Sequence, residues 1–118
     1  MAELKVENDK LLLKLSRLEK AESVHGDLSA PLSAVQSIDV LENAHLPADQ
    51  GIKFGTRLPG MFEIGTMSSK GKKVFAVVHR STPRGVRIVL QGESYDEWIV
   101  GCDDPEAVAS AVSTHLAR

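Results

Sequence analysis

Cysteine is almost absent from the sequence, because Cys102 is its only one. A single cysteine excludes a disulfide within the chain and a cysteine-rich zinc site, and it is typical of a reducing compartment. Long apolar runs are also missing: no segment approaches the roughly 20 apolar residues of a membrane span, and the first residues lack the basic start and apolar core of a signal peptide. We therefore expect a cytoplasmic chain that is neither exported nor embedded in a membrane.

Patterns typical of catalysis or metal binding are absent as well. No two of the four histidines lie three to five residues apart, which argues against a metal site. No Gly-x-Ser-x-Gly turn is present to expose a nucleophilic serine. Cys102 would follow a strand and precede a helix, where a thiolate can be stabilised, but a lone cysteine there is more often a small buried side chain. We expect no enzyme activity, no cofactor and no metal.

The first residues present the pattern of a β-hairpin. Apolar and charged residues alternate over 2–7, which predicts a strand with one buried face. Asn8 and Asp9 supply a turn that tolerates positive φ, and residues 11–15 would return as the second strand. Ser16 and Glu19 then have capping-box spacing, so we expect a short helix near residues 17–24.

Further strands follow, separated by turns rich in glycine, proline and serine. They are expected over residues 27–31, 36–42, 61–67, 73–78, 86–90 and 96–102. Residues 43–60 lack periodicity and contain several glycines and prolines, so this segment is interpreted as one long loop.

The sequence ends in an amphipathic helix. Asp104 can cap its free N–H groups, and Pro105 suits its first position. The apolar residues on one face at helical spacing are Val108, Ala111, Val112 and Leu116. We expect residues 1–118 to form a single α+β domain of seven to eight mostly antiparallel strands, as a small bent β-barrel or two orthogonal sheets, with this helix capping one end.

Charge is unevenly distributed along the chain although the net charge is only −2. Residues 1–42 carry a net charge of −3, residues 43–92 of +6 and residues 93–118 of −5. Such segregation can mark an anion-binding face, or strands of opposite charge can simply complement one another. The candidate anion-binding residues lie in the middle segment: Lys53, Arg57, Lys70, Lys72, Lys73, Arg80 and Arg84.

Two parts of this basic segment present different possibilities. Lys53, Thr56 and Arg57 lie among glycines in the 53–60 loop, whose N–H groups could cradle a phosphate, but the loop could equally fold over one end of a barrel. The 70–87 stretch contains six basic residues and no acid, and could form a stripe for phosphates. The chain has only five aromatic residues, however, and this argues against stacking of single-stranded nucleic acid.

Three segments resemble the bacterial pleckstrin-homology-like (PH-like) domains, and more closely small actinobacterial proteins of that type. The segments are APLSAV at 30–35, FAVV at 75–78 and WIVGCDDPE at 98–106, so the resemblance spans most of the chain. It implies a bent barrel with a helix closing one open end. It implies little about the ligand, because this fold hosts phosphoinositide, peptide and protein binding.

The lipid-binding relatives use basic residues around the first hairpin, whereas here Lys5, Lys10, Lys14 and Arg17 alternate with acids. We therefore expect a non-catalytic cytoplasmic binding or scaffolding module with a protein partner, rather than nucleic acid or a membrane surface. Self-association is left open. The alternative is an anion-binding domain for an acidic peptide, lipid headgroup or nucleic acid, using the 70–87 stretch and the 53–60 loop.

Overall fold

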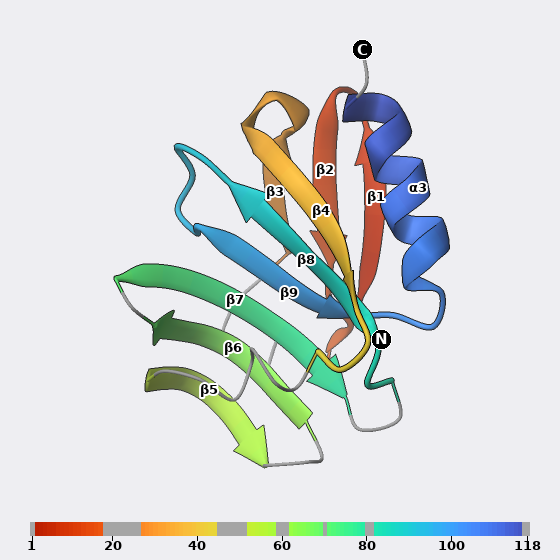
Figure 1. Ribbon diagram of the computed structural model, residues 1–118. Coiled ribbons are helices and arrows are strands. Elements are labelled where there is room, and N and C mark those ends of the chain that lie inside the picture. The colour runs from red at the N-terminus through yellow and green to blue at the C-terminus, as the bar shows by residue number, and fades with distance from the viewer. Residues whose placement is uncertain are drawn as a thin grey trace.

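The computed structural model describes residues 2–17, 27–44, 52–58, 62–69, 71–79 and 82–116, without the side chains of 52–58, 62, 63 and 69. The expected short helix near 17–24 lies outside the described residues, apart from its first residue. Two sheets and one long helix make up this part of the chain (Figure 1).

The first sheet is the expected hairpin with one more strand. β1 (Glu3–Glu7) pairs antiparallel with β2 (Lys10–Lys14), which pairs antiparallel with β3 (Leu28–Pro31). Asn8 and Asp9 form the turn with φ of 51° and 63°, the left-handed conformation that a two-residue hairpin requires. Apolar alternation places Leu11 and Leu13 of β2 on the fully buried face.

The chain then crosses to a second sheet through the 3-10 turn η1 (Leu32–Ala34). The N–H of Leu32 donates to the carbonyl of Asp9 (2.9 Å), so the crossing is fastened to the hairpin turn. The strands of the second sheet are β4 (Val35–Leu41), β5 (Ile52–Leu58), β6 (Phe62–Ser69), β7 (Lys72–His79), β8 (Gly85–Leu90) and β9 (Glu97–Gly101). Their spatial order is β4-β8-β9-β7-β6-β5, and β7 and β9 form its one parallel pair.

The chain continues into α3 (Pro105–Leu116), as the Asp-Pro pattern predicts. Asp104 Oδ1 accepts a hydrogen bond from the N–H of Ala107 (3.1 Å), which confirms the expected N-cap. The helix packs against β4, β8 and η1, and Figure 1 shows it beside β1. It therefore covers the side of the molecule where an edge strand of each sheet lies.

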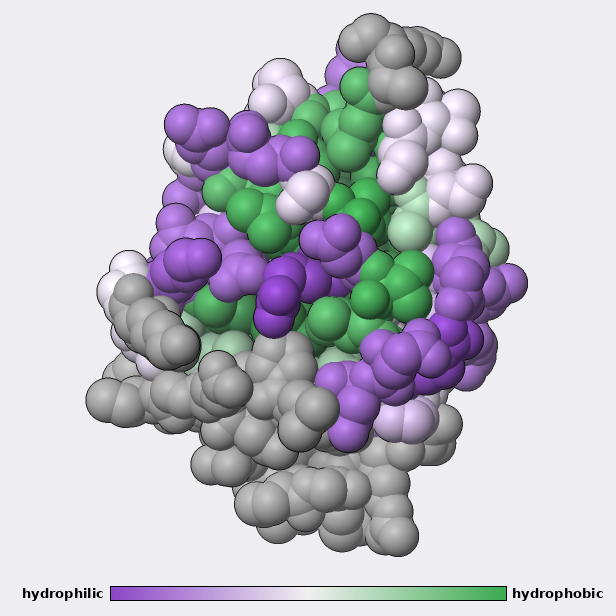
Figure 2. Space-filling model, in the orientation of Figure 1, coloured by the Kyte–Doolittle hydropathy of each residue, from purple (hydrophilic) through white to green (hydrophobic). Residues whose placement is uncertain are grey.

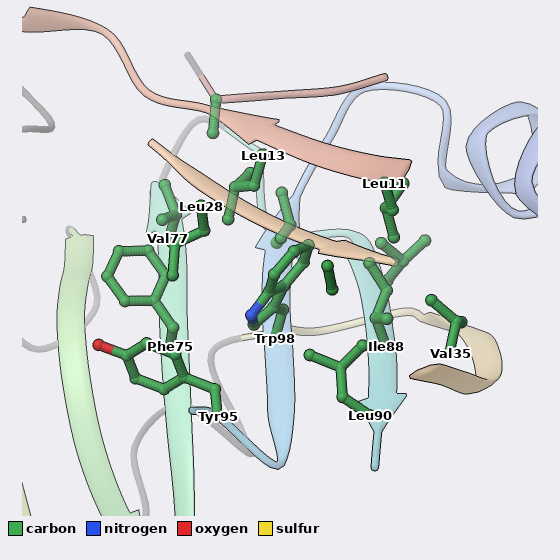
Figure 3. Close-up of a cluster of buried hydrophobic side chains, with 14 of the residues drawn as sticks. Leu11, Leu13, Leu28, Val35, Phe75, Val77, Ile88, Leu90, Tyr95 and Trp98 are labelled. Carbon is green, nitrogen blue, oxygen red and sulfur yellow. The ribbon is translucent and has the colours of Figure 1, made fainter. Parts of the chain in front are cut away.

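The main core fills the space between the two sheets. Trp98 and Phe75, which are 2% and 0% exposed, are its largest fully buried side chains. In Figure 3 Trp98 lies in the middle of the cluster, with Phe75 and Tyr95 on one side and Ile88 on the other. Phe75 and Tyr95 meet edge to face with ring centroids 5.5 Å apart. Trp98 is thus buried in the last strand, β9.

The α+β class and the helix at the end of the chain are confirmed. The strands form two separate sheets and not one closed barrel, and two sheets were the second of the two expected architectures. The described residues contain nine strands, where seven to eight were expected. The long loop over 43–60 is interrupted by β5, in which Gly55 pairs with Gly65 of β6. Glycine weakens a strand, but a complete ladder with a neighbouring strand supports it here.

Candidate functional site

An apolar groove runs between β1 and α3. It has a volume of about 390 Å³, and the residues that line it are Leu4, Val6, Ala107, Val108, Ala111, Val112 and His115. Leu4, Val6 and Val108 are only half-buried, although all three contact the main core. Figure 2 shows apolar residues reaching the surface between hydrophilic ones on the face seen in Figure 1. The core is therefore incompletely covered along this side of α3.

Small side chains explain why the groove exists. From the sequence, Val108, Ala111, Val112 and Leu116 were expected to cover the open end together. Val112 is 3% exposed and does so, but Ala111 is exposed and Val108 and Leu116 are half-buried. Ala107 and Ala111 carry one methyl group each, so they leave space between the helix and the strand. The two alanines one helical turn apart are the signal that sequence reasoning overlooked.

The backbone along the groove belongs to a sheet edge. Among the described strands, β2 alone pairs with β1. In a two-residue hairpin the residues that flank the turn, here Glu7 and Lys10, exchange hydrogen bonds, and bonded and non-bonded pairs then alternate along the ladder. The register pairs Lys5 with Leu12, and this pair is therefore also bonded. The N–H and C=O groups of Leu4 and Val6 consequently point away from β2, toward the free edge.

The charges on the outer face of β1 alternate in sign. Glu3, Lys5 and Glu7 are all exposed there, and Lys5 Nζ lies 3.8 Å from Glu3 Oε1. The register places Lys14 opposite Glu3 and Lys10 opposite Glu7 on β2. The edge itself thus presents a negative, a positive and a negative side chain in succession, with a net charge of −1.

Two of the predicted anion-binding residues, Lys72 and Lys73, line a second hollow at the β6–β7 turn. Its volume is about 550 Å³, and its other lining residues are Thr66, Ser68, Gly71 and Asp96. The ammonium of Lys73 lies 4.8 Å from the centroid of the Tyr95 ring, and the N–H of Lys73 donates to Asp96 Oδ2 (2.9 Å). The hollow combines two cations and two hydroxyls with one carboxylate.

Arg84 lies elsewhere and is bound by acids of its own chain. Its Nη2 donates to Glu42 Oε2 (2.8 Å) and also bonds Glu106 Oε2, while its Nε is buried without a hydrogen-bond partner. The two carboxylates raise the pKa of Arg84, and the guanidinium lowers the pKa of Glu106. The positive charge of Arg84 is therefore already balanced by two carboxylates, and an incoming anion would have to compete with them.

The remaining predicted anion-binding residues are only partly visible. Lys53 and Arg57 lie on β5, whose side chains are not among those described, and Lys70 and Arg80 fall outside the described residues. Arg87, also in the 70–87 stretch, has its Nε 3.2 Å from Glu97 Oε1. Of the seven candidates, the structure brings Lys72 and Lys73 together and separates them from Arg84.

Cys102 follows β9 directly and is half-buried. Burial, with Asp103 and Asp104 nearby, raises the pKa of its thiol to about 11. The thiol is thus protonated at neutral pH, which is the opposite of an activated nucleophile. Within the described residues, no three His, Cys, Asp or Glu side chains are grouped so that they could hold a metal ion.

In the part of the chain that is described, no helix is long and apolar enough to cross a membrane. No family model matches the chain. Comparison with curated proteins and with solved structures likewise found no match.

Proposed function

We propose that the chain is a non-catalytic protein-binding module whose binding surface is the groove between β1 and α3. The observation that carries the proposal is that half-buried apolar side chains lie beside an edge of β1 with which no other described strand pairs. Apolar surface that stays open beside a well-formed core is typical of interaction sites. The raised thiol pKa of Cys102 supports the absence of nucleophilic catalysis. The single cysteine supports a cytoplasmic location.

We also propose a PH-like fold for the chain, on the basis of the sequence resemblance. In its support, α3 closes the side where the edge strands β1 and β4 lie, as a helix does in that family. The parallel pair of β7 and β9 and the division into three and six strands depart from a simple antiparallel barrel. The proposed binding surface does not depend on this relationship.

Anion binding is the second candidate function, and the hollow with Lys72 and Lys73 favours it. Two ammonium groups and the hydroxyl of Ser68 are suitable donors for a phosphate or carboxylate, whereas the hydroxyl of Thr66 already shares a hydrogen bond with Tyr95 Oη (2.7 Å). Asp96 opposes such a ligand, since its carboxylate lines the same hollow. Arg84 is held by Glu42 and Glu106, so among the described residues that could form a stripe over 70–87, Lys72 and Lys73 make a local site.

The two functions can be separated by selecting random peptides that bind the chain at about 0.5 M salt, where attraction between exposed charges is screened. We expect the selected peptides to lose binding about tenfold or more, about 1.4 kcal/mol, when Ala111→Trp fills the groove. Ser113→Trp is the matched control, because Ser113 is exposed on the same helix and does not line the groove.

Selected peptides that bind the Ala111→Trp protein as well as the wild type would contradict the groove as the binding surface. Failure to select any peptide would contradict it as well. If binding is instead lost with Lys72→Glu and weakens steeply with salt, the anion-binding function is the right one.

A further inference from the structure

We infer that the partner binds as an added antiparallel strand along β1. It is an extended segment that carries, in order, a basic, an apolar, an acidic, an apolar and a basic residue. This inference rests on the proposed function and specifies the chemistry of its partner. Addition of a strand to a sheet edge combines main-chain hydrogen bonds, which give affinity, with pockets for alternate side chains, which give specificity.

The main-chain part of the site is formed by Leu4 and Val6. Their N–H and C=O groups point toward the free edge, because the register bonds Lys5 and Glu7 to β2. An antiparallel strand would therefore exchange two pairs of hydrogen bonds with β1, one at each of these residues. Only a peptide with an extended backbone can form the hydrogen bonds to Leu4 and to Val6 at the same time.

The side chains that lie opposite Leu4 and Val6 would enter the groove. Residues directly opposite each other in a sheet share a face, so these two partner residues project toward Val108 and Ala111 of α3. A volume of 390 Å³ suits a few aliphatic side chains. A helix would leave the edge groups of Leu4 and Val6 unbonded, because its own N–H and C=O groups bond within the helix.

The outward side chains of the added strand would meet Glu3, Lys5 and Glu7. Opposite charges across a strand pair stabilise it and like charges destabilise it. A matching partner therefore carries Lys or Arg opposite each glutamate and an acid opposite the lysine.

A second copy of the chain matches this edge poorly. Pairing of two β1 strands with Leu4 opposite Val6 fills both apolar positions, but it places lysine opposite lysine and glutamate opposite glutamate. Shifting the register by two residues places lysine opposite glutamate, but only one of the two apolar positions is then filled by a large side chain. The two α3 helices would also have to share one face of the joined sheet.

The test uses a blocked peptide, Ser-Lys-Val-Glu-Val-Lys-Ser, and two N-methylated forms of it. Methylation of both valines removes the N–H groups that would donate to Leu4 and Val6. Methylation of the glutamate and the second lysine removes the same number of N–H groups from the outward side. We expect the first form to bind about tenfold or more weakly than the parent peptide, and the second within about threefold.

The outcomes separate the inference from the proposed function. If both methylated forms bind equally well, and Ala111→Trp still abolishes binding, strand addition is wrong and the groove remains the binding surface. If Ala111→Trp has no effect on peptide binding, the groove is not the binding surface and the proposed function is wrong. A parent peptide that does not bind overturns the stated partner chemistry, while peptide selection still tests the groove.

Two controls cover charge and self-association. The charge-swapped peptide Ser-Glu-Val-Lys-Val-Glu-Ser should bind about tenfold more weakly at low salt, because it places like charges opposite β1. Equal binding of the two peptides would contradict the charge complementarity. Sedimentation of the chain should show a monomer at micromolar concentration, and a dimer that Ala111→Trp dissociates would assign the groove to a second copy.

Discussion

The thiol of Cys102 has a raised pKa, which follows from its half-buried place beside two aspartates. The pKa of its thiol is raised to about 11, whereas the unfolded value is near 8.5. The folded state holds the proton more tightly. The thiol therefore leaves stability unaffected below about pH 8.5, and it lowers stability as the pH rises toward 11.

We predict that alkylation of Cys102 in the folded protein accelerates with a midpoint near pH 11. In denaturant the midpoint should fall to about 8.5. The measurement is the rate of iodoacetamide labelling against pH, followed by mass spectrometry. A folded-state midpoint at or below that of the unfolded chain would mean that the thiol is activated and would revive a catalytic role.

Trp98 anchors the main core and is 2% exposed. We predict that Trp98→Ala lowers the free energy of unfolding by about 3–5 kcal/mol, because the cavity it leaves cannot collapse between two sheets. Chemical denaturation followed by circular dichroism measures this change. The native protein should also emit at the short wavelengths of a buried indole, and emission typical of solvated indole would disprove the placement.

At the scale of the element, α3 depends on its first turn. We predict that Asp104→Ala lowers the free energy of unfolding by about 1 kcal/mol, because the N–H of Ala107 loses its acceptor. Asp103→Ala is the matched control, since Asp103 is exposed and precedes the cap. Equal effects of the two substitutions would show that general charge near the helix, and not the cap, is responsible.

Lys72 and Lys73, the first two residues of β7, lie in different surroundings. Lys72 is exposed, whereas the ammonium of Lys73 lies over the Tyr95 ring. We predict that Lys72→Glu changes the free energy of unfolding by less than about 0.5 kcal/mol. Lys73→Glu should cost about 0.5–1 kcal/mol through loss of the cation–π contact. Thermal melts of both variants test this, and a reversed order would contradict the placement of Lys73.

The elements differ in how far the sequence specifies them. Asn8 and Asp9 predict the first hairpin, and Asp104 with Pro105 predicts α3. Both predictions succeed because these residues determine the backbone conformation of the turn in which they lie. The strand β5 was not predicted from the sequence, because its glycine is locally typical of a loop. The strand is stabilised by its pairing with β6, which the local sequence does not show. The parallel pair of β7 and β9 was also beyond local reasoning, since strand order depends on contacts between distant segments.

The same distinction applies to the candidate site. Lys72 and Lys73 were predicted from charge alone and do lie together in a hollow. The groove was not predicted, because it arises from two short side chains on α3 facing a strand about 100 residues earlier in the sequence. An amphipathic stripe indicates which face of a helix is apolar, but it does not indicate how completely that face is covered.

At the scale of the whole molecule, two arginines of the basic middle segment pair with acids of the two acidic segments. Arg84 from the basic middle segment is bound by Glu42 from the first segment and Glu106 from the last, and Arg87 lies beside Glu97. These ion pairs join segments of opposite charge without an anionic ligand.

The whole molecule also depends on α3. The helix is 12 residues long, near the limit at which helices persist alone, so packing must stabilise it. Val112 is buried, and Val108 and Leu116 contact the core. We predict that truncation after Cys102 yields an unfolded or aggregating chain, because full burial of each such side chain contributes roughly 1.5–3 kcal/mol. A truncated chain that melts cooperatively as a monomer would contradict the closing role of α3.

The central claim is that the edge of β1 beside α3 is open and binds a partner. The most direct measurement is hydrogen exchange of single backbone amides by NMR, with and without a groove-binding peptide. We predict that the amides of Leu4 and Val6 exchange fast in the free chain, that the amide of Lys5 exchanges slowly, and that the peptide slows both fast amides. Slow exchange of Leu4 and Val6 in the free chain, or a peptide that changes only the amides around Lys72 and Lys73, would contradict it.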